Sequence, residues 1–399
     1  MITVKEAVSC LQKETSVITE MEKVSLFESV GRILAEDAAA LFDQPPFPRS
    51  PLDGYAIRAK DSVNASKKNP VTLKVIGEVC AGAVFSAAVK QGEAVRIMTG
   101  APIPKGADTV IKQEDTDYGM EKVQIYDWLS PYQNYCYQGE DYKAGDVLLK
   151  KGTVLDGVAV GILASLGFSE VLVYRKPRVG IISTGDEVME PGADLKPGKI
   201  YDSNLYLIGA RLKELGITPV FLLHCEDNPE KMTELIRKKE GEVDLLITTG
   251  GVSVGKKDIM HEVLNLLSAN QLFWKVALKP GSPTLAALYE KTLLICLSGN
   301  PFGAAANFEL LVRPVLAALT GSRKWEMKRE RAIFQCDFPK ASKNRRYIRG
   351  FYNEGKVWIP ERKHSSGILS TMAGCNCLIE IEPGNAGLKK GYTVWVNLL

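Results

Sequence analysis

Five polar segments in the middle of the chain carry the side chains best suited to chemistry. They are residues 183–187, 226–228, 249–255, 279–283 and 298–301, and each follows a run of apolar residues. Any one of them alone is typical of an ordinary turn or helix cap. Together, each after its own predicted strand, they indicate a single pocket outside the carboxyl ends of a sheet, where α/β proteins bind ligands.

The third segment has the composition of an anion-binding turn. Gly250, Gly251 and Gly255 permit positive φ values and let main-chain N–H groups approach a ligand closely. Thr249 and Ser253 place hydroxyl donors beside those N–H groups. Successive N–H groups in such a turn form a concavity that binds phosphate. The segment therefore predicts a phosphate site.

Carboxylates share this predicted edge with the phosphate-binding groups. Lys279 and the helix N-termini favour phosphate. The acids that would repel it are Asp186, Glu187, Asp227 and Asp258. A Mg²⁺ ion between the carboxylates and a phosphorylated ligand reconciles the two sets. A polar heterocycle that donates hydrogen bonds to one or two carboxylates is the other interpretation, and the two can hold together.

The elements that must position these segments alternate between strand and helix. Alternation of this kind predicts a central, doubly wound, mostly parallel α/β sheet. We expect strands at residues 179–182, 218–223, 245–248, 273–278, 285–288 and 293–297. We expect helices at residues 205–215, 229–241, 258–268 and 301–321. Asp202, Ser203 and Asn204 are capping candidates for the first of these helices.

The rest of the chain predicts further domains, since 399 residues exceed one ordinary core. A proline-rich crossing precedes a β-like pattern cut by Gly and Pro, and an apolar helix at 156–168 is expected to pair with the N-terminal helix. The expected domains are a discontinuous N-terminal domain (1–50 and 137–175), an inserted small β-rich domain (51–136), the α/β domain (176–322) and a C-terminal β-barrel-like domain (323–399).

Composition argues against several classes of partner. The formal net charge of +3 gives no general electrostatic case for nucleic acid or a membrane surface. No segment approaches the roughly 20 apolar residues of a membrane helix, and the N-terminus lacks the apolar core of a signal peptide. We therefore expect a cytoplasmic protein that binds neither nucleic acid nor membranes.

Histidine and cysteine placement argues against covalent catalysis. His224, His261 and His364 have no serine or cysteine nucleophile motif around them, and the chain contains no G-x-S-x-G or Walker A sequence. Cys375 and Cys377 form an isolated C-x-C pair, so neither a disulfide framework nor a zinc site is expected. Metal-assisted displacement at a phosphoryl bond is the better interpretation.

A basic segment lies beyond the α/β region. Residues 323–349 contain ten Lys or Arg side chains and three acids. One interpretation is a solvated face, and the sharper one is capture of an oxyanion or phosphate by Arg345, Arg346 and Arg349. Nucleic acid is a weaker third interpretation, because the aromatic residues are not interleaved as a stacking platform.

The ordered set of motifs resembles the MoeA-type molybdopterin molybdenumtransferases, which include the gephyrin E domain. The matching motifs are residues 53–56, 96–102, 139–141, 183–187, 201–204, 250–255, 279–281 and 299–301, and they span nearly the whole chain. The resemblance implies an elongated four-domain subunit, a homodimer, and an α/β domain of the molybdopterin-binding type, similar to molybdopterin adenylyltransferases. It also implies that adenylylated molybdopterin and molybdate react with the help of Mg²⁺, that AMP is released, and that the adenylyltransferase is a contact partner.

The same resemblance implies roles for individual residues. The catalytic set is Asp53, Asp141, Glu187, Asp227 and Asp258, with Asp53 and Asp141 reaching the pocket of the other subunit. The metal set is Asp186, Glu187, Asp227 and Asp258. The binding set is Thr184, Gly185, Ser203, Asn204, Thr249, Gly250, Gly251, Ser253, Gly255, Lys279, Gly281, Ser298, Gly299, Asn300, Arg349 and Ser366.

The chain departs from the family pattern beside the glycine turn. Lys256 replaces an acid and Ile259 an aromatic residue, while Leu52 and Ser298 alter two further motifs. No predicted aspartate is lost. An active molybdenum-inserting transferase is the first hypothesis. A catalytically altered relative that serves as a molybdopterin-binding or scaffold protein is the alternative, and a general nucleotide phosphohydrolase is a weaker third.

Overall fold

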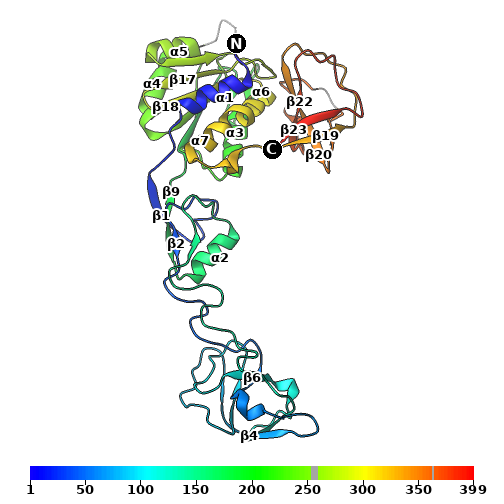
Figure 1. Cartoon of the computed structure of the whole chain (residues 1–399). Helices are drawn as coiled ribbons and strands as arrows, with labels where there is room; N and C mark the ends of the chain where they lie inside the picture. Colours follow the sequence, from blue (N-terminus) through cyan, green and yellow to red (C-terminus); the bar gives the residue numbers. More distant parts are fainter. Residues whose placement is uncertain (253–258, 362–363) are drawn as a thin grey trace. The chain divides into compact units, whose positions relative to one another are not determined.

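The computed structural model describes residues 1–252, 259–361 and 364–399. The chain folds into two compact units. The first combines Met1–Ala35, Val154–Asp156 and Val171–Leu399, and the second combines Glu36–Thr153 and Gly157–Glu170. In the colours of Figure 1, the chain leaves the first unit in blue and returns to it in green. The second unit is therefore an insertion into the first.

A six-stranded sheet in the order β13-β10-β14-β18-β17-β15 forms the centre of the first unit (Figure 1). The first four strands of this order run parallel, β17 runs antiparallel to both of its neighbours, and β15 therefore has the direction of the first four. Their bounds are β10 Val179–Thr184, β13 Phe221–Cys225, β14 Leu245–Thr249, β15 Asn270–Trp274, β17 Leu285–Tyr289 and β18 Thr292–Leu297. The prediction of a mostly parallel sheet is confirmed.

The strand register brings the polar segments together. Thr184 lies opposite Cys225, Ser183 opposite Thr249, and Thr249 opposite Leu297. Because these residues end or nearly end their strands, the segments that follow begin side by side. β10, β14 and β18 are buried along their whole lengths, as expected for parallel strands covered on both faces.

Helices cover both faces of the sheet, which makes it doubly wound. Alternate strand residues enter two separate cores: Ile181 packs with α1, α3, α6, η4 and α7, whereas Ile182 packs with α4 and α5. The bounds are α1 Val4–Lys13, α3 Ser203–Glu214, α4 Pro229–Lys239, α5 Met260–Leu267, α6 Pro301–Asn307, η4 Phe308–Val312 and α7 Arg313–Thr320. Asp202 and Asn228 cap α3 and α4.

The N-terminal helix belongs to this α/β layer. Ala7 and Leu11 of α1 are fully buried in the same core as α7. The helix predicted at 156–168 forms as α2, Gly157–Ser165, and lies in the second unit. The predicted pairing of these two helices is therefore wrong. An amphipathic pattern shows that one helix face is buried, but it does not show against which element.

One core helix corrects an expectation about membranes. Pro301–Thr320, which joins α6, η4 and α7, is 20 residues long and apolar enough to cross a membrane by length and composition. The expectation that no segment approaches the length and apolar content of a membrane helix was therefore wrong. In the fold, 89% of its most apolar window is buried, and Glu309 forms an ion pair of 2.9 Å with Arg313 inside the helix. It is a core helix of the α/β layer.

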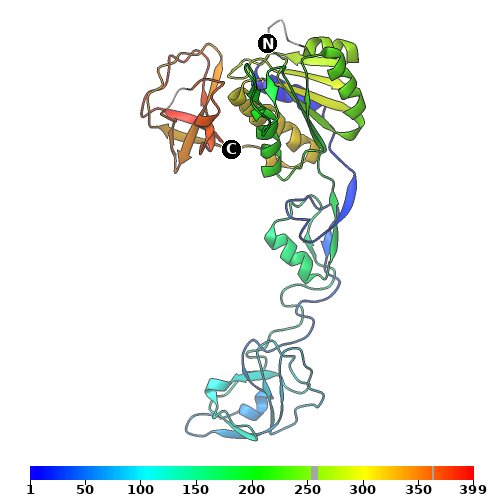
Figure 2. The ribbon, with the colours of Figure 1, turned by 180° about the vertical axis from the view of Figure 1, so that it is seen from behind.

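A closed sheet forms the C-terminal part of the first unit, drawn in orange to red in Figure 2. Its strands are β19 Arg329–Phe334, β20 Arg345–Asn353, β21 Lys356–Trp358, β22 Cys377–Ile381 and β23 Thr393–Leu398. β20 pairs with both β21 and β22, which closes the sheet and confirms the predicted barrel-like domain. β16, Leu278–Lys279, leaves the α/β layer and pairs in parallel with the start of β20.

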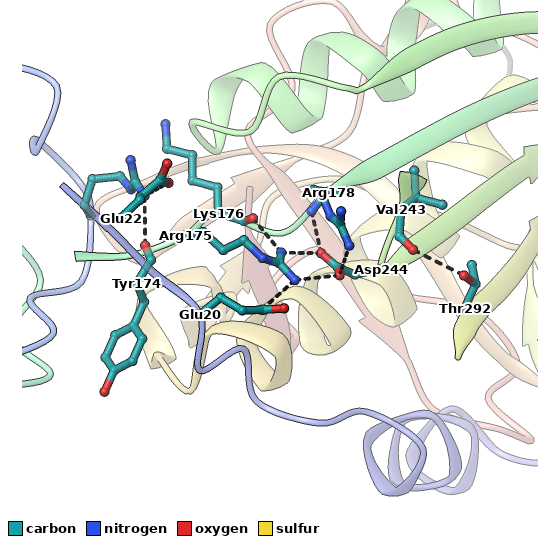
Figure 3. Close-up of polar contacts among 10 residues, drawn as sticks. Glu20, Glu22, Tyr174, Arg175, Lys176, Arg178, Val243, Asp244 and Thr292 are labelled. Atoms are coloured by element: carbon teal, nitrogen blue, oxygen red, sulfur yellow. Dashed lines mark hydrogen bonds and ion pairs between the residues drawn. The ribbon is translucent and has the colours of Figure 1, made fainter. Parts of the chain in front are cut away.

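An ion-pair network fixes the chain where β9 leads into the central sheet. β9, Glu170–Tyr174, pairs with β1, Met21–Ser25. Arg175 then donates to both carboxylate oxygens of Asp244 at 2.7 and 2.9 Å, and it pairs with Glu20 at 2.8 Å (Figure 3). Burial alone would raise the pKa of Asp244, but the hydrogen bonds from Arg175 and from the Arg178 N–H outweigh burial and hold the pKa below its ordinary value.

The second unit contains a five-stranded sheet in the order β6-β3-β5-β4-β7. Its strands are β3 Gly54–Ile57, β4 Val71–Val79, β5 Glu93–Ile97, β6 Thr109–Lys112 and β7 Lys122–Ile125. This sheet is the predicted small β-rich insertion. The same unit holds α2 and a two-stranded pair made by β2, Ala38–Ala39, and β8, Val147–Leu149.

Candidate functional site

A cavity of about 660 Å³ lies at the carboxyl ends of β10, β13, β14 and β18. The segments that follow these four strands line it, and Pro283 reaches it from the fourth predicted polar segment. The predicted residues brought together here are Thr184, Gly185, Glu187, Ser203, Asn204, Asp227, Thr249, Gly250, Gly251, Ser298, Gly299 and Asn300. We call this space the sheet-edge cavity. β11, Val188–Met189, and β12, Ile200–Tyr201, flank it as a small parallel pair.

The glycine turn after β14 needs its glycines for two reasons. Gly250 and Gly251 adopt φ values of +95° and +63°, which side chains other than glycine rarely accept. A Cβ atom on Gly250 would also lie 2.4 Å from the carbonyl oxygen of Thr184. The turn therefore packs against the neighbouring segment backbone to backbone, and its main chain borders the cavity directly.

Asp186 and Asp227 are linked by reciprocal hydrogen bonds, in which the backbone N–H of each residue faces the carboxylate of the other. The Asp227 N–H donates to Asp186 Oδ1 at 3.1 Å, and the Asp186 N–H approaches Asp227 Oδ2 at 3.3 Å. Thr184 Oγ1 donates to the other oxygen of Asp227 at 2.8 Å. The segments after β10 and β13 are thereby locked together, with Glu187 beside them in the cavity wall.

These oxygens suit Mg²⁺, which is usually held by one or two carboxylates together with substrate phosphates and water. Glu187 and Asp227 offer carboxylates in the cavity wall, whereas Asp186 does not line the cavity and contacts it through Asp227. Among the residues that the structure describes, no three His, Cys, Asp or Glu side chains gather closely enough to hold a metal alone. A Mg²⁺ ion here would therefore take its remaining ligands from phosphate and water.

Two buried oxygens in the cavity wall have no hydrogen-bond partner within the described part of the chain. They are Asp202 Oδ2 and Asn204 Oδ1. Each side chain is otherwise anchored, since Asp202 Oδ1 accepts the Leu205 N–H and Asn204 Nδ2 donates to the Gly299 carbonyl at 2.8 Å. An unpaired buried acceptor is costly, so both oxygens suit N–H donors of a heterocycle. The sequence marked Asp202 as a helix cap and as part of the 201–204 motif, but not as a site residue.

A second cavity of about 880 Å³ adjoins the first, because Ser298 and Asn300 line both. The predicted residues Lys279, Gly281 and Ser366 lie in its wall. Three further cationic or titratable side chains join them, namely Lys340, Arg346 and His364. We call this space the basic cavity. Burial lowers the pKa of His364, and the nearby positive charges of Arg349 and Lys340 lower it further.

The pairing of β16 with β20 creates the basic cavity. Lys279 lies opposite Arg346, so a segment of the α/β layer and a barrel strand present positive charges at the same place. Arg345 instead pairs with Glu380 and Glu382. Of the three arginines in the predicted basic set, Arg346 is the one that lines the cavity.

Arg349 lies behind the basic cavity. Its side chain is 1% exposed, and it donates to the carbonyls of Ser365 and Ile368, both at 3.0 Å. The guanidinium also stacks over the Phe302 ring at 4.3 Å. Arg349 therefore anchors the segment that precedes η6 (Ser370–Met372). Gly367 and Leu369 of that segment line the sheet-edge cavity.

Asn307 supports the loop that carries Lys279. This side chain is fully buried in α6, and its Nδ2 donates to the Gly281 carbonyl at 2.9 Å and to Thr284 Oγ1. A Cβ atom on Gly281 would lie 2.4 Å from Asn307 Oδ1. Sequence reasoning missed Asn307; its only signal was a polar residue within an apolar helical run.

Comparison with known proteins covers the whole chain. Family models match "MoeA N-terminal region (domain I and II)" at residues 2–167, "Probable molybdopterin binding domain" at 180–318 and "MoeA C-terminal region (domain IV)" at 331–399. A molybdopterin molybdenumtransferase of Staphylococcus epidermidis is 39% identical over 400 residues, which cover 100% of this chain and 95% of that relative. The chain belongs to the MoeA family.

Other MoeA relatives agree. A molybdopterin molybdenumtransferase of Staphylococcus aureus is 37% identical over 396 residues, covering 98% of this chain and 94% of the relative. The crystal structure of a molybdopterin biosynthesis MoeA protein from Pyrococcus horikoshii has 35% identity and a TM-score of 0.82, with 100% of each chain covered. A Pyrococcus furiosus molybdenum cofactor biosynthesis protein, 22% identical with a TM-score of 0.60, shares the fold.

The remaining predicted residues lie elsewhere. Asp53 and Asp141 belong to the second unit, within the region matched by the MoeA N-terminal model. The N–H and hydroxyl of Thr99 both donate to Asp53 Oδ1 at 2.7 Å, and these bonds lower the pKa of Asp53. The Asp141 N–H donates to the Gln44 carbonyl at 2.9 Å. Ser253, Gly255 and Asp258, like the substituted Lys256, lie outside the described residues.

Proposed function

We propose that this protein inserts molybdenum from molybdate into adenylylated molybdopterin and releases AMP. The observation that carries this proposal is that the segments after four parallel strands converge on the sheet-edge cavity, which opens beside a basic cavity. A phosphorylated heterocycle and an oxyanion are the ligands that these two neighbouring spaces suit. The names of relatives at 37–39% identity over nearly the whole chain support the same activity.

We assign the larger substrate to the sheet-edge cavity. The glycine turn at Gly250 and Gly251 would bind phosphate oxygens through main-chain N–H groups. Asp202 and Asn204 would accept hydrogen bonds from N–H groups of the heterocycle, which would satisfy their unpaired oxygens. Thr184 holds Asp227 in place at the carboxylate end.

Molybdate is the second substrate, and we assign it to the basic cavity. Lys279 and Arg346 supply positive charge, and Ser366 supplies a hydroxyl group. An oxyanion of two negative charges matches such a lining. Ser298 and Asn300 form the wall shared with the sheet-edge cavity, so the two substrates would meet there.

Mg²⁺ is a proposed cofactor: one or two carboxylates from the set Asp186, Glu187 and Asp227 would hold it together with phosphate and water, with Asp258 as a further predicted ligand. Bound Mg²⁺ neutralises phosphate charge and so favours departure of AMP. Residues of the chain would position the reacting groups. The glycine turn would orient the phosphates, and Asn307 holds the Lys279 loop against α6. Asp53 stays ionised because two donors from Thr99 stabilise its carboxylate.

We also propose that the protein acts as a homodimer in the cytoplasm, in contact with the molybdopterin adenylyltransferase. In the first unit Phe27 is 89% and Val30 53% exposed, and in the second unit Leu41 is 80% and Val158 73% exposed. An interface with a second chain would bury apolar side chains such as these. All eight cysteines are free thiols, which supports a reducing compartment.

AMP release from adenylylated molybdopterin, measured with Mg²⁺ and either molybdate or tungstate, tests the proposed function. The wild-type protein should release AMP in an oxyanion-dependent manner. Asp202→Asn should reduce the rate because an amide presents an N–H group to ligand donors, whereas Glu230→Gln, an exposed carboxylate at the start of α4, should not. Binding without AMP release, restored by Lys256→Glu, would instead support the scaffold hypothesis.

A further inference from the structure

A third cavity, of about 240 Å³, lies in the first unit and is separate from the two described above. Lys176 and Pro177, which precede β10, form part of its wall. The sheet-edge cavity begins where β10 ends, so the two cavities lie at opposite ends of this strand. We call it the junction cavity, because its other walls come from the segment around Arg32 and from the ends of α3 and α7.

The inner wall of the junction cavity is apolar. Ile18, Ile33, Leu215 and Trp325 contribute to it. Trp325, at the end of η5 (Arg323–Trp325), is only 6% exposed, and its carbonyl accepts a hydrogen bond from Arg313 at 2.9 Å. This anchoring makes the wall a fixed surface that a flat apolar group can contact.

Four cationic side chains line the same cavity, namely Arg32, Arg175, Lys176 and Lys324, together with the carboxylate of Glu214, which pairs with Arg211. Arg32 is 7% exposed, pairs with Glu22, and donates to the Tyr174 carbonyl at 2.8 Å. Figure 3 shows that Arg175 turns toward Asp244 while the side chain of Lys176 points away from it. The two adjacent cations thus serve different purposes, and Lys176 is directed away from the Asp244 network.

Neither lysine has a carboxylate partner among the residues that the structure describes. Lys324 Nζ makes one long contact of 3.4 Å with the Gly31 carbonyl. Loss of water contact lowers the pKa of Lys176, repulsion by Arg32 and Lys324 lowers it further, and attraction by Glu22 offsets only part of the shift. A bound anion would relieve this repulsion, since it would attract all three positive charges.

The helix ends nearby do not account for the lysines. Helix C-termini attract cations through their unpaired carbonyls. Here the Gly216 N–H donates to the Lys213 carbonyl and the Ile217 N–H donates to the Leu212 carbonyl, which closes the last turn of α3. The last turn of α7 is closed in the same way, by backbone N–H groups and by the Thr320 hydroxyl. The carbonyls of Leu212, Lys213, Ala317 and Ala318 are therefore satisfied without help from Lys176 or Lys324.

We propose that the junction cavity binds a small organic anion with a flat apolar body, such as an aryl phosphate or an aromatic carboxylate. The anionic group would lie among Lys176, Lys324 and Arg32, and the body would contact Trp325 and the isoleucines. Inorganic phosphate would engage the cations but leave the apolar wall uncovered. A neutral aromatic compound would do the reverse.

Methyl NMR on the full chain, labelled at isoleucine δ1 methyls, tests this proposal. Ile18 and Ile33 report on the junction cavity, and Ile200 reports on the sheet-edge cavity. The methyls are assigned with Ile→Val variants. Phenyl phosphate should shift the Ile18 and Ile33 signals in a saturable way. Inorganic phosphate and benzyl alcohol, used as separate probes, should each bind at least about fivefold more weakly at these two methyls.

Charge-removing variants locate the anionic group. Lys176→Met and Lys324→Met should each weaken phenyl phosphate binding at the Ile18 and Ile33 methyls by about fivefold. Lys238→Met, at an exposed position on α4, makes the same change in net charge and should leave it unaltered. The proposal is overturned if phenyl phosphate shifts only Ile200, if benzyl alcohol binds equally well, or if the Lys238 variant weakens binding as much as the Lys176 variant.

Discussion

Replacing Asn307 with alanine should show how much oxyanion binding depends on the order of the Lys279 loop, because the positive charges of the basic cavity stay in place. Asn307 Nδ2 donates to the Gly281 carbonyl and to Thr284 Oγ1, both in the loop that carries Lys279. The variant removes these donors but changes no group that lines either substrate cavity. We therefore expect the loop to become less ordered, while the cations and the glycine turn remain present.

The expected loss of stability follows from the contacts. Two buried hydrogen bonds contribute about 1 kcal/mol each, and the small cavity left by the amide costs about 1 kcal/mol more. The Gly281 carbonyl still accepts from Thr284 Oγ1 at 2.8 Å, which limits the cost. Loss of the unpaired Asn307 Oδ1 offsets part of it. We expect a net loss of about 2 kcal/mol in urea-induced unfolding of the first unit.

Steady-state AMP release then measures the functional effect. The KM for molybdate should rise about tenfold, equivalent to about 1.4 kcal/mol, because the oxyanion would have to order the loop as it binds. The KM for adenylylated molybdopterin should change less. Asn265→Ala, at an exposed position on α5, is the matched control and should alter neither quantity. A stability loss of the expected size with an unchanged KM for molybdate would refute the positioning role of Asn307.

Three further predictions follow from contacts at other places in the fold. Because the folded state depresses the pKa of Asp244, its ionised form stabilises the fold above about pH 4, and this contribution is lost as pH falls through the folded-state pKa. The Asp244→Asn variant should therefore have a lower melting temperature than the wild type at pH 7, and its melting temperature should fall less than that of the wild type on acidification to pH 3. Gly250→Ala should cost more stability than Gly216→Ala, since both have positive φ but only Gly250 would place a Cβ 2.4 Å from a carbonyl oxygen; equal melting temperatures would contradict this. Arg349→Lys keeps the charge but cannot bridge the Ser365 and Ile368 carbonyls as a guanidinium does, and thermal unfolding should show a loss of about 2 kcal/mol.

The sheet-edge cavity could be predicted from sequence because each polar segment lies close in the chain to the strand that positions it. Each polar segment follows its strand within a few residues, and parallel pairing with Thr184 opposite Cys225 then brings the segments together. The pattern is local, and the topology of a parallel sheet supplies the rest. Most strands and helices of this region were accordingly predicted with small differences at their ends, but the strand predicted at 273–278 forms instead at Asn270–Trp274 as β15.

The basic cavity could not be predicted in the same way. It depends on Lys279 meeting Arg346 across the β16 and β20 pair, a contact between residues far apart in the chain. Composition marked residues 323–349 as basic, but it did not show which arginines face a cavity and which are paired or buried. Asp202 and Asn307 were missed as site residues because each also has an ordinary local interpretation, as a helix cap and as a helix residue.

The shared wall of the two substrate cavities has a consequence for inhibitor design. Since Ser298 and Asn300 border both spaces, the two cavities are neighbours, and a molecule that extends past these two side chains would engage both. A planar heterocycle carrying a phosphate, extended by a short linker to a sulfonate or second phosphate, would address the glycine turn and the Lys279–Arg346 pair together. Linking the two groups would also raise the effective concentration of the second one at its site.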